Sequence, residues 1–312
     1  DYWRDDLELP NSNSGSPCGI CPCNSSDCPW WDFRPTALWL PRIYDIQAFE
    51  DSGWNRCKLF TIVGVTVHSL HPDWMHAKHL GTDKVKLGSV LWLLVHFVVE
   101  APDVDERLSI VWGMIQKLYK EDHVANRFGN LKMTMFTAGA SPKLKGKAAE
   151  VKDLGPVLHK VWMAFYNPNL ELHRKIEVVL RTGAHLDAIL DEHPGAFALP
   201  SDAAADLVST VVVHLSVFAE LRVWFANDLN HLFQLTQKGH YLMHCCLLSH
   251  ALNPRRSWCY SGEDLMGKSR DLAASCSKGN SMWQVSNKMT GKYLGAMDLT
   301  LTDPDAWFGR RR

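Results

Sequence analysis

The chain has 312 residues, of which 46% are apolar, enough to build one large domain or two ordinary ones around a buried core. This composition excludes a chain that is disordered throughout. The formal net charge of −1 at pH 7 argues against a uniformly basic nucleic-acid binder, although an average of this kind can hide local patches. The longest uncharged apolar runs, at 87–99 and 207–219, are shorter than the roughly 20 residues that span a bilayer, so no membrane partner is expected.

Loops, one strand and a long helical block are predicted in that order. Residues 1–35 are dense in Asn, Ser, Gly, Pro and Cys without any period, which is typical of loops. The short β-branched segment 58–67 is the best strand candidate. Segments separated by Pro and Asn-Pro breaks predict helices at 84–100, 104–122, 147–166, 170–192, 202–226, 229–252 and 261–277, of which 202–226 and 229–252 are long amphipathic stretches. From residue 279 on the pattern weakens, and the chain ends in a basic tail. An α+β fold that is mostly helical is therefore predicted.

Four of the nine cysteines lie within eleven positions of the N-terminal loop, at Cys18, Cys21, Cys23 and Cys28. Thiolates two or three residues apart on a Gly/Pro turn can converge on a tetrahedral metal, most often zinc. Because the gaps are short, His68 or His71 could complete such a site in space. A reduced loop without metal, or a redox pair, explains the same spacing.

Two histidine-containing segments are further candidates. Asp73 and His76 are three residues apart and share one face if a helix starts after Pro72, so they could share a divalent metal or a proton. The simpler interpretation is that Asp73 caps that helix. His240 and His244 are also one helical turn apart, but Tyr241 stands where a zinc protease needs glutamate. Two hydrogen-bonded imidazoles in a packed helix explain that pair.

Positive charge gathers in two segments. Residues 130–160 contain six basic and two acidic residues, and residues 254–312 contain ten basic and six acidic residues. Such segments could follow a phosphate backbone, and solvated helix faces look the same. The candidate DNA-binding residues are Lys143, Lys145, Lys147, Arg255, Arg256, Lys268 and Arg270. Among the last four, Glu263 and Asp264 open a helix and could hold a metal beside phosphate-binding neighbours.

Taken in order, these pieces resemble the C-terminal portion of the RNase H-like (DDE/D) cut-and-paste DNA transposases of the CACTA and KDZ types. The resemblance rests on the Cys-Pro-x-Cys-like turn at 18–23 and on the string "LHPDWMHAKHL" at 70–80, with Asp73, His76 and Lys78. It continues through "GKAAEVKDLGP", which contains Lys147, Glu150 and Pro156. It ends with a helix containing Lys238, His240 and His244, followed by an acidic helix at Glu263.

The resemblance implies a fold and a chemistry. The fold is a partial RNase H-like mixed sheet with a large all-helical insertion. Its parts are a Cys-rich loop and core edge at 1–57, a core strand and Asp-x-x-His motif at 58–83, the insertion at 84–252, and a Glu-bearing helix with a basic tail at 253–312. Catalytic carboxylates would hold Mg²⁺ for phosphodiester cleavage and strand transfer. By this correspondence the catalytic set is Glu263 (or Asp264), Asp1 (or Asp5 or Asp6), Asp73 and His76, with the first aspartate upstream of the chain.

The resemblance implies a nuclear protein with DNA as partner and with self-association. A reducing compartment is indicated by the five cysteines outside the loop, which lack the spacing of a disulfide framework. Because the carboxylate set is incomplete, we expect a fragment, or a decayed or domesticated copy, that does not cleave DNA alone. One alternative is a non-catalytic zinc-containing module that binds DNA or another partner. A second alternative is an unrelated metal hydrolase that uses His71, Asp73, His76 and His79.

Overall fold

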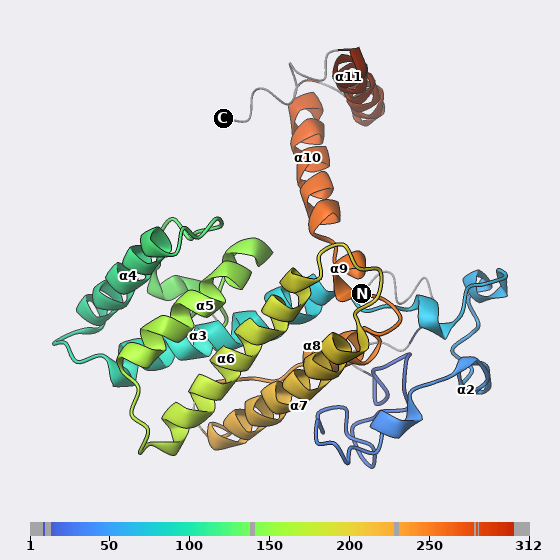
Figure 1. Cartoon of the computed structure of the whole chain (residues 1–312). Coiled ribbons are helices and arrows are strands. Elements are labelled where there is room, and N and C mark those ends of the chain that lie inside the picture. Colours follow the sequence, from blue (N-terminus) through green and yellow to red (C-terminus); the bar gives the residue numbers. More distant parts are fainter. Residues whose placement is uncertain are drawn as a thin grey trace. The chain divides into compact units, whose positions relative to one another are not determined.

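The computed structural model describes residues 9, 14–137, 141–227, 231–277, 279 and 281–302. It forms two compact units, one through Trp258 and one from Cys259 onward, and each is described here by itself. Figure 1 shows that both units are built from helices joined by loops. Over the described residues, the β-type pairing consists of one isolated bridge between Asn24 and Pro29.

The predicted α+β fold with a partial RNase H-like sheet is therefore wrong. The segment expected to be a strand contains instead a short 3-10 turn, η2 (Lys58–Thr61). The β-branched residues that follow it face solvent, with Ile62 54% and Val63 fully exposed. A β-branched run forms a strand when a neighbouring strand pairs with it and a buried face covers it. Here the burial comes from an aromatic contact instead, since Phe60 packs on Phe49 of α2 (Ile46–Asp51) at 5.0 Å.

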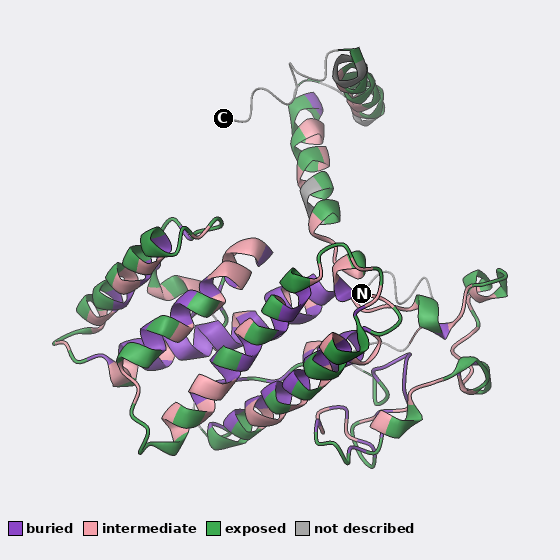
Figure 2. Cartoon of the chain, viewed as in Figure 1, coloured by how far each residue is buried: buried purple, intermediate pink, exposed green. Residues whose placement is uncertain are grey.

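A buried helical path runs through the centre of the first unit. It begins as the π-helix η4 (Met75–Thr82), continues as α3 (Asp83–Leu93) and ends as the π-turn η5 (Leu94–Val98). Nearly every residue of α3 is buried, so it has no polar face and the sequence shows no amphipathic period there (Figure 2). This all-round burial fits a helix that has neighbours on several sides.

Amphipathic helices surround that path. α4 (Val104–Glu121) packs on η5 and on α5 (Ala148–Ala164), and α5 packs on α6 (Glu171–Glu192). α6 lies along α7 (Ser201–Trp224), which in turn contacts α8 (Gln237–Leu247). The helices predicted at 104–122, 170–192 and 202–226 are confirmed to within two residues. The helix expected from 229 begins only at Gln237, and a short helix, α9 (Pro254–Ser257), closes the unit.

α7 is the one helix among the described residues that is long and apolar enough to cross a membrane. Within its apolar window 44% of the residues are buried in the protein, against α6 and α8. α7 therefore packs as a core helix of this bundle.

The second unit consists of α10 (Tyr260–Ser277) and α11 (Met282–Thr302), which pack on each other. The helix predicted at 261–277 is confirmed, and α11 was missed because its apolar residues follow no clear period. Several large apolar side chains of this pair face solvent, among them Leu265, Met266 and Trp283.

Candidate metal centre and the pocket beside it

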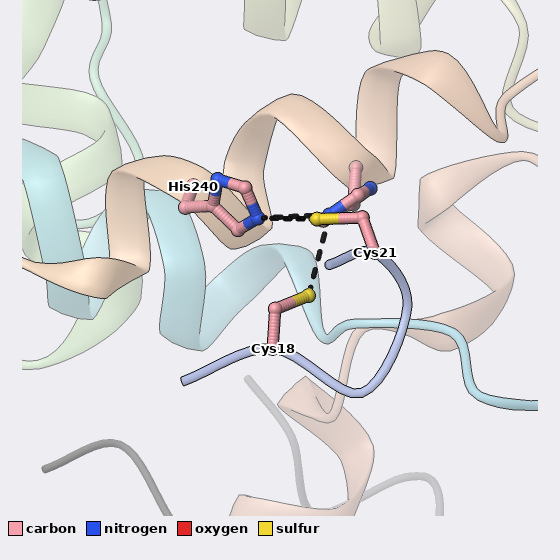
Figure 3. A group of neighbouring side chains, drawn as sticks. Cys18, Cys21 and His240 are labelled. Carbon is pink, nitrogen blue, oxygen red and sulfur yellow. Dashed lines mark hydrogen bonds between the residues drawn. The ribbon is translucent and has the colours of Figure 1, made fainter. Parts of the chain in front are cut away.

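Two cysteines of the N-terminal loop and two histidines of α8 converge on one buried point. His240 Nε2 lies 3.3 Å from Cys21 Sγ, and the two residues face each other in Figure 3. His244 Nε2 lies 3.4 Å from Cys18 Sγ and 3.0 Å from His240 Nε2. All four donor atoms lie within 4.8 Å of one another. Donors at the corners of a tetrahedral metal site with bonds of about 2.0–2.3 Å are about 3.3–3.8 Å apart. The four side chains could therefore hold a metal ion.

The hydrogen bonding of His240 prepares it to be a ligand. Its Nδ1 lies 3.0 Å from the carbonyl oxygen of Trp30, a partner that accepts a proton. The ring therefore carries its proton on Nδ1, which leaves a lone pair on Nε2 toward the two thiols. Metal-bound histidines are oriented in this way by a hydrogen bond from the other ring nitrogen.

The three neighbouring thiols share their charge unequally. Burial opposes ionisation of Cys18, but hydrogen bonds from Cys21 and Cys23 and the imidazoles of His244 and His240 hold its pKa well below the usual value. Burial raises the pKa of Cys21, and the hydrogen bond with Cys18 raises that of Cys23. A metal cation bound between these groups would stabilise the thiolate forms of its cysteine ligands, and its binding would release protons.

The local sequence explains why these side chains meet. His240 and His244 are one turn apart on α8, so their rings share a face. The N-terminal loop is held on that face by Tyr241, whose hydroxyl donates to the carbonyl of Pro17 at 2.6 Å. Trp39 is fully buried against the ring of His240, with the centroids 4.4 Å apart.

Of the four predicted cysteine ligands, Cys23 and Cys28 do not belong to the four-residue group. Cys23 lies close to the centre, since its Sγ is 3.4 Å from His240 Nε2, which makes it a fifth potential donor. Cys28 is buried elsewhere in the loop, where its backbone N–H donates to Asn24, and it does not belong to the four-residue group. The missing ligands are His240 and His244 rather than His68 or His71. The sequence showed that His240 and His244 share one helix face. It contained no local pattern that links them to a loop more than 200 residues away.

Asp73 both caps a helical segment and pairs with His76. One carboxylate oxygen accepts a hydrogen bond from the backbone N–H of Met75 at 3.0 Å, and the other contacts His76 Nδ1.

Of the other expected catalytic residues, Glu263 belongs to α10 in the second unit, and Asp1 lies outside the described residues. The sheet that would bring these carboxylates together is not seen in the part of the chain that the structure describes, and the Mg²⁺ site stays a prediction.

A second cluster, formed by Lys78, His79, Asp83, Lys86 and Asp187, is a buried charge network. Lys78 Nζ bridges Asp83 at 2.8 Å and Asp187 at 2.6 Å. Lys86 Nζ lies 2.6 Å from Asp83, and His79 Nε2 lies 2.9 Å from Asp187. Although three of these residues have donors close enough for a metal, two lysines already balance the two carboxylates. We interpret the network as the polar link between η4, α3 and α6.

A pocket of about 720 Å³ opens beside the Cys/His group. Gly19 and Tyr241, which flank the metal-ligand candidates in sequence, lie in its wall. Lys143 and Lys238 add positive charge to the same wall, and Lys238 Nζ donates to the carbonyl of Leu80 at 3.1 Å. The remaining lining combines apolar side chains with the Asp73–His76 pair.

The predicted DNA-binding residues fall into three groups. Lys143, Lys145 and Lys147 are all exposed and alternate with buried Leu144 on an extended segment. That segment is attached to the bundle by backbone bonds, such as the 2.9 Å bond from Leu144 N–H to the carbonyl of Lys84. The three side chains have no carboxylate partner among the described residues. Figure 2 shows exposed residues at the surface of the bundle around buried helix faces.

Arg255 and Arg256 bind to other segments of the first unit. Arg255 pairs with Asp191 and stacks on Trp258, with its guanidinium carbon 4.4 Å from the ring centroid. Arg256 donates to the carbonyls of Gly195 and Ala196, which ties down the loop before α7. Lys268 and Arg270 are exposed on α10, where Arg270 pairs with Asp271. The lysine row at 143–147 is thus the strongest candidate for a phosphate contact in the first unit.

A scan against protein-family models and searches of curated proteins and of solved structures found no match to this chain.

Proposed function

We propose that this chain is a non-catalytic, zinc-organised DNA-binding module of a transposase-like protein. The observation that carries the proposal is the convergence of Cys18, Cys21, His240 and His244 on one buried point. DNA as the partner is supported by the lysine row, which lacks carboxylate partners among the described residues, and by the transposase-like order of motifs in the sequence.

Zinc suits the donor set better than other common metals. Two thiolates and two imidazoles in a tetrahedron are typical of zinc, and two thiolates cancel its charge so that the centre can be buried. All four donors belong to the protein, which leaves no position for water or substrate. A closed centre of this kind supports a structural role. All nine cysteines are free thiols, as expected in a reducing compartment such as the nucleus.

The metal content of the purified full chain tests the centre. We expect one tightly bound zinc per chain by mass spectrometry of the metal, and its loss in Cys18→Ser and in His244→Ala. Cys28→Ser is the matched control, because that thiol is equally buried in the same loop but outside the group. Zinc retained in both ligand variants, or lost in the control, would contradict the assignment.

DNA binding is tested by fluorescence anisotropy with a labelled duplex over a range of salt concentrations. Replacing Lys143, Lys145 and Lys147 with methionine removes about three phosphate contacts, so the slope of log K against log salt should fall by about 2 to 3. Lys160→Met is the control, because Lys160 is exposed but bound to Asp122. An unchanged slope in the triple variant would rule out this surface.

The same preparation addresses catalysis. Incubation of a labelled duplex with the chain and Mg²⁺ or Mn²⁺ is expected to leave the DNA intact. Specific nicking that disappears in Glu263→Ala would replace the proposed module with an active nuclease.

A further inference from the structure

The pocket beside the metal-centre candidate is lined by two chemically different sets of side chains. Apolar groups of Ile20, Leu70, Pro72 and Val85 form one part of its wall. Lys143 and Lys238 form the cationic part. Its volume of about 720 Å³ falls in the range of pockets that enclose small organic ligands, about 300–1,000 Å³.

The two lysines of this pocket share it with one carboxylate, Asp73, which raises the pKa of Lys238 while burial and the ammonium groups of Lys143 and Lys84 lower it. Neither Lys143 nor Lys238 forms an ion pair with any described residue. Burial lowers the pKa of nearby Lys84, and the ammonium group of Lys143 lowers it further, so like charges crowd this edge. An anion that binds between them would relieve the repulsion, and a phosphate group is the anion that lysines bind as point charges.

Gly81 allows Lys238 to lie close to η4 at the pocket. A Cβ at Gly81 would lie 2.8 Å from the carbonyl oxygen of His76 and 2.9 Å from Lys238 Cδ. Without that atom, the stem of Lys238 crosses the helix η4 at close range and its ammonium group reaches the carbonyl of Leu80. The lysine is therefore held at the pocket by the backbone.

We propose that this pocket binds a single nucleotide, with its phosphate at Lys143 and Lys238 and its base against the apolar side. The ring of Tyr241 adds an aromatic surface to the wall, on which a base can stack. Lys143 also begins the row that continues through Lys145 and Lys147. The assignment deepens the proposed DNA-binding function and rests on it, because the row leads a bound strand to the pocket.

Titration calorimetry of the zinc-loaded full chain with deoxyadenosine monophosphate tests the pocket. The nucleotide should bind at least about tenfold more tightly than deoxyadenosine or inorganic phosphate, which corresponds to about 1.4 kcal/mol. Lys143→Met should weaken the nucleotide about tenfold and leave deoxyadenosine unchanged. Lys132→Met, at an exposed site outside the pocket, is the charge-matched control.

A variant that fills the pocket tests whether binding requires the cavity as well as the lysine charges. Thr236 is exposed at the pocket wall and makes no side-chain capping bond, so Thr236→Trp fills the space without removing a helix cap. It should abolish binding of both nucleotide and nucleoside, whereas Ser109→Trp on the exposed face of α4 should not. Circular dichroism and zinc content confirm that each variant is folded. Equal affinity for nucleotide and inorganic phosphate, or full binding by the folded Thr236→Trp variant, would overturn the proposal.

The source of the nucleotide is distinguished with two duplexes, one containing a single unpaired deoxyadenosine and the other an abasic residue at that position. Tighter binding of the first identifies an extruded nucleotide of a bound strand, as in enzymes that remove a base from the stack. Equal binding of the two, with free nucleotide still bound, identifies a free nucleotide. Loss of duplex binding with nucleotide binding intact contradicts only the proposed DNA-binding function.

Discussion

Lys78 is a buried cation whose two carboxylate partners come from different parts of the chain. Its ammonium group contacts Asp83 at the start of α3 and Asp187 in α6, and all three groups are shielded from water. Burial opposes the charge of Lys78, but the two aspartates raise its pKa to about 12. Removing it would leave Asp187 with His79 as its closest partner.

We therefore expect Lys78→Met to lower the free energy of unfolding by about 3–5 kcal/mol, the cost of an uncompensated buried charge. Urea unfolding followed by circular dichroism measures it. Lys160→Met removes an exposed pair with Asp122 and should cost less than about 1 kcal/mol. Equal effects of the two substitutions would show that the buried network does not stabilise the fold.

The same network predicts how stability depends on pH. Despite burial, Lys78 and Lys86 lower the pKa of Asp83 from 3.8 to about 2, and Lys78 with His79 lowers that of Asp187 further. A carboxyl group with a lowered pKa in the folded state stabilises that state above its unfolded pKa, and this stabilisation is lost as the pH falls. The urea midpoint should thus fall steeply between about pH 4 and pH 2. Chelator-treated protein should show the same fall, which separates it from protonation of metal ligands.

At the scale of elements, α3 and the lysine row are in direct backbone contact at Gly88. A Cβ there would lie 2.8 Å from the backbone nitrogen of Leu144 and 3.0 Å from the Cα of Lys143. Backbone atoms cannot rotate away as a side chain can, so the extended segment would have to move off the helix. Because Gly88 has no side chain, the segment that contains the lysine row can pack directly on α3.

Gly88→Ala is expected to destabilise the protein by about 1–3 kcal/mol through overpacking, although alanine is the better helix former. Gly113→Ala in α4 is the matched control, because a Cβ at Gly113 would meet no described atom of another segment within 4 Å. That helix should gain up to about 1 kcal/mol from the substitution. Thermal unfolding of both variants gives the comparison. A stabilised Gly88→Ala variant would mean that the segment does not lie on α3.

At the scale of the whole molecule, the Cys/His group joins the N-terminal loop to a helix more than 200 residues later. The helices α3 to α7 pack on one another without this link, because their contacts lie within 83–224. Residues 14–39 of the loop form no helix, and they are joined to the bundle through side chains such as Trp39, which packs on His240, and through the bond from Tyr241 to Pro17. Loss of metal should therefore affect the loop far more than the helices.

Chelation of the metal is expected to leave most of the helical circular dichroism and to expose the loop. Amide hydrogen exchange within 14–44 should accelerate at least about tenfold, a loss of about 1.4 kcal/mol in local opening free energy. Exchange in α3 and α6 should change little, and added zinc should restore protection of the loop. Uniform acceleration over the whole first unit would show instead that the metal holds the entire bundle.

Local patterns in the sequence predicted most helices and two of the four candidate metal ligands. Periodic apolar residues and proline breaks located α4, α6 and α7, because each buries one face and the period is local. Cys18 and Cys21 were found for a similar reason, since their spacing on a Gly/Pro turn is a local property of the chain. The exposed lysines at 143–147 were also visible as a run of charge.

The other features depend on contacts between segments that are far apart in the sequence. The segment 58–67 has the residues of a strand but no neighbouring strand to pair with among the described residues, and pairing is a property of two segments rather than one. His240 and His244 become candidate ligands because α8 turns them toward a loop at the other end of the first unit. The pocket likewise forms only in the folded chain, because its wall combines residues from the start of the first unit with residues near position 240. A local sequence pattern cannot predict which distant residues come together on folding.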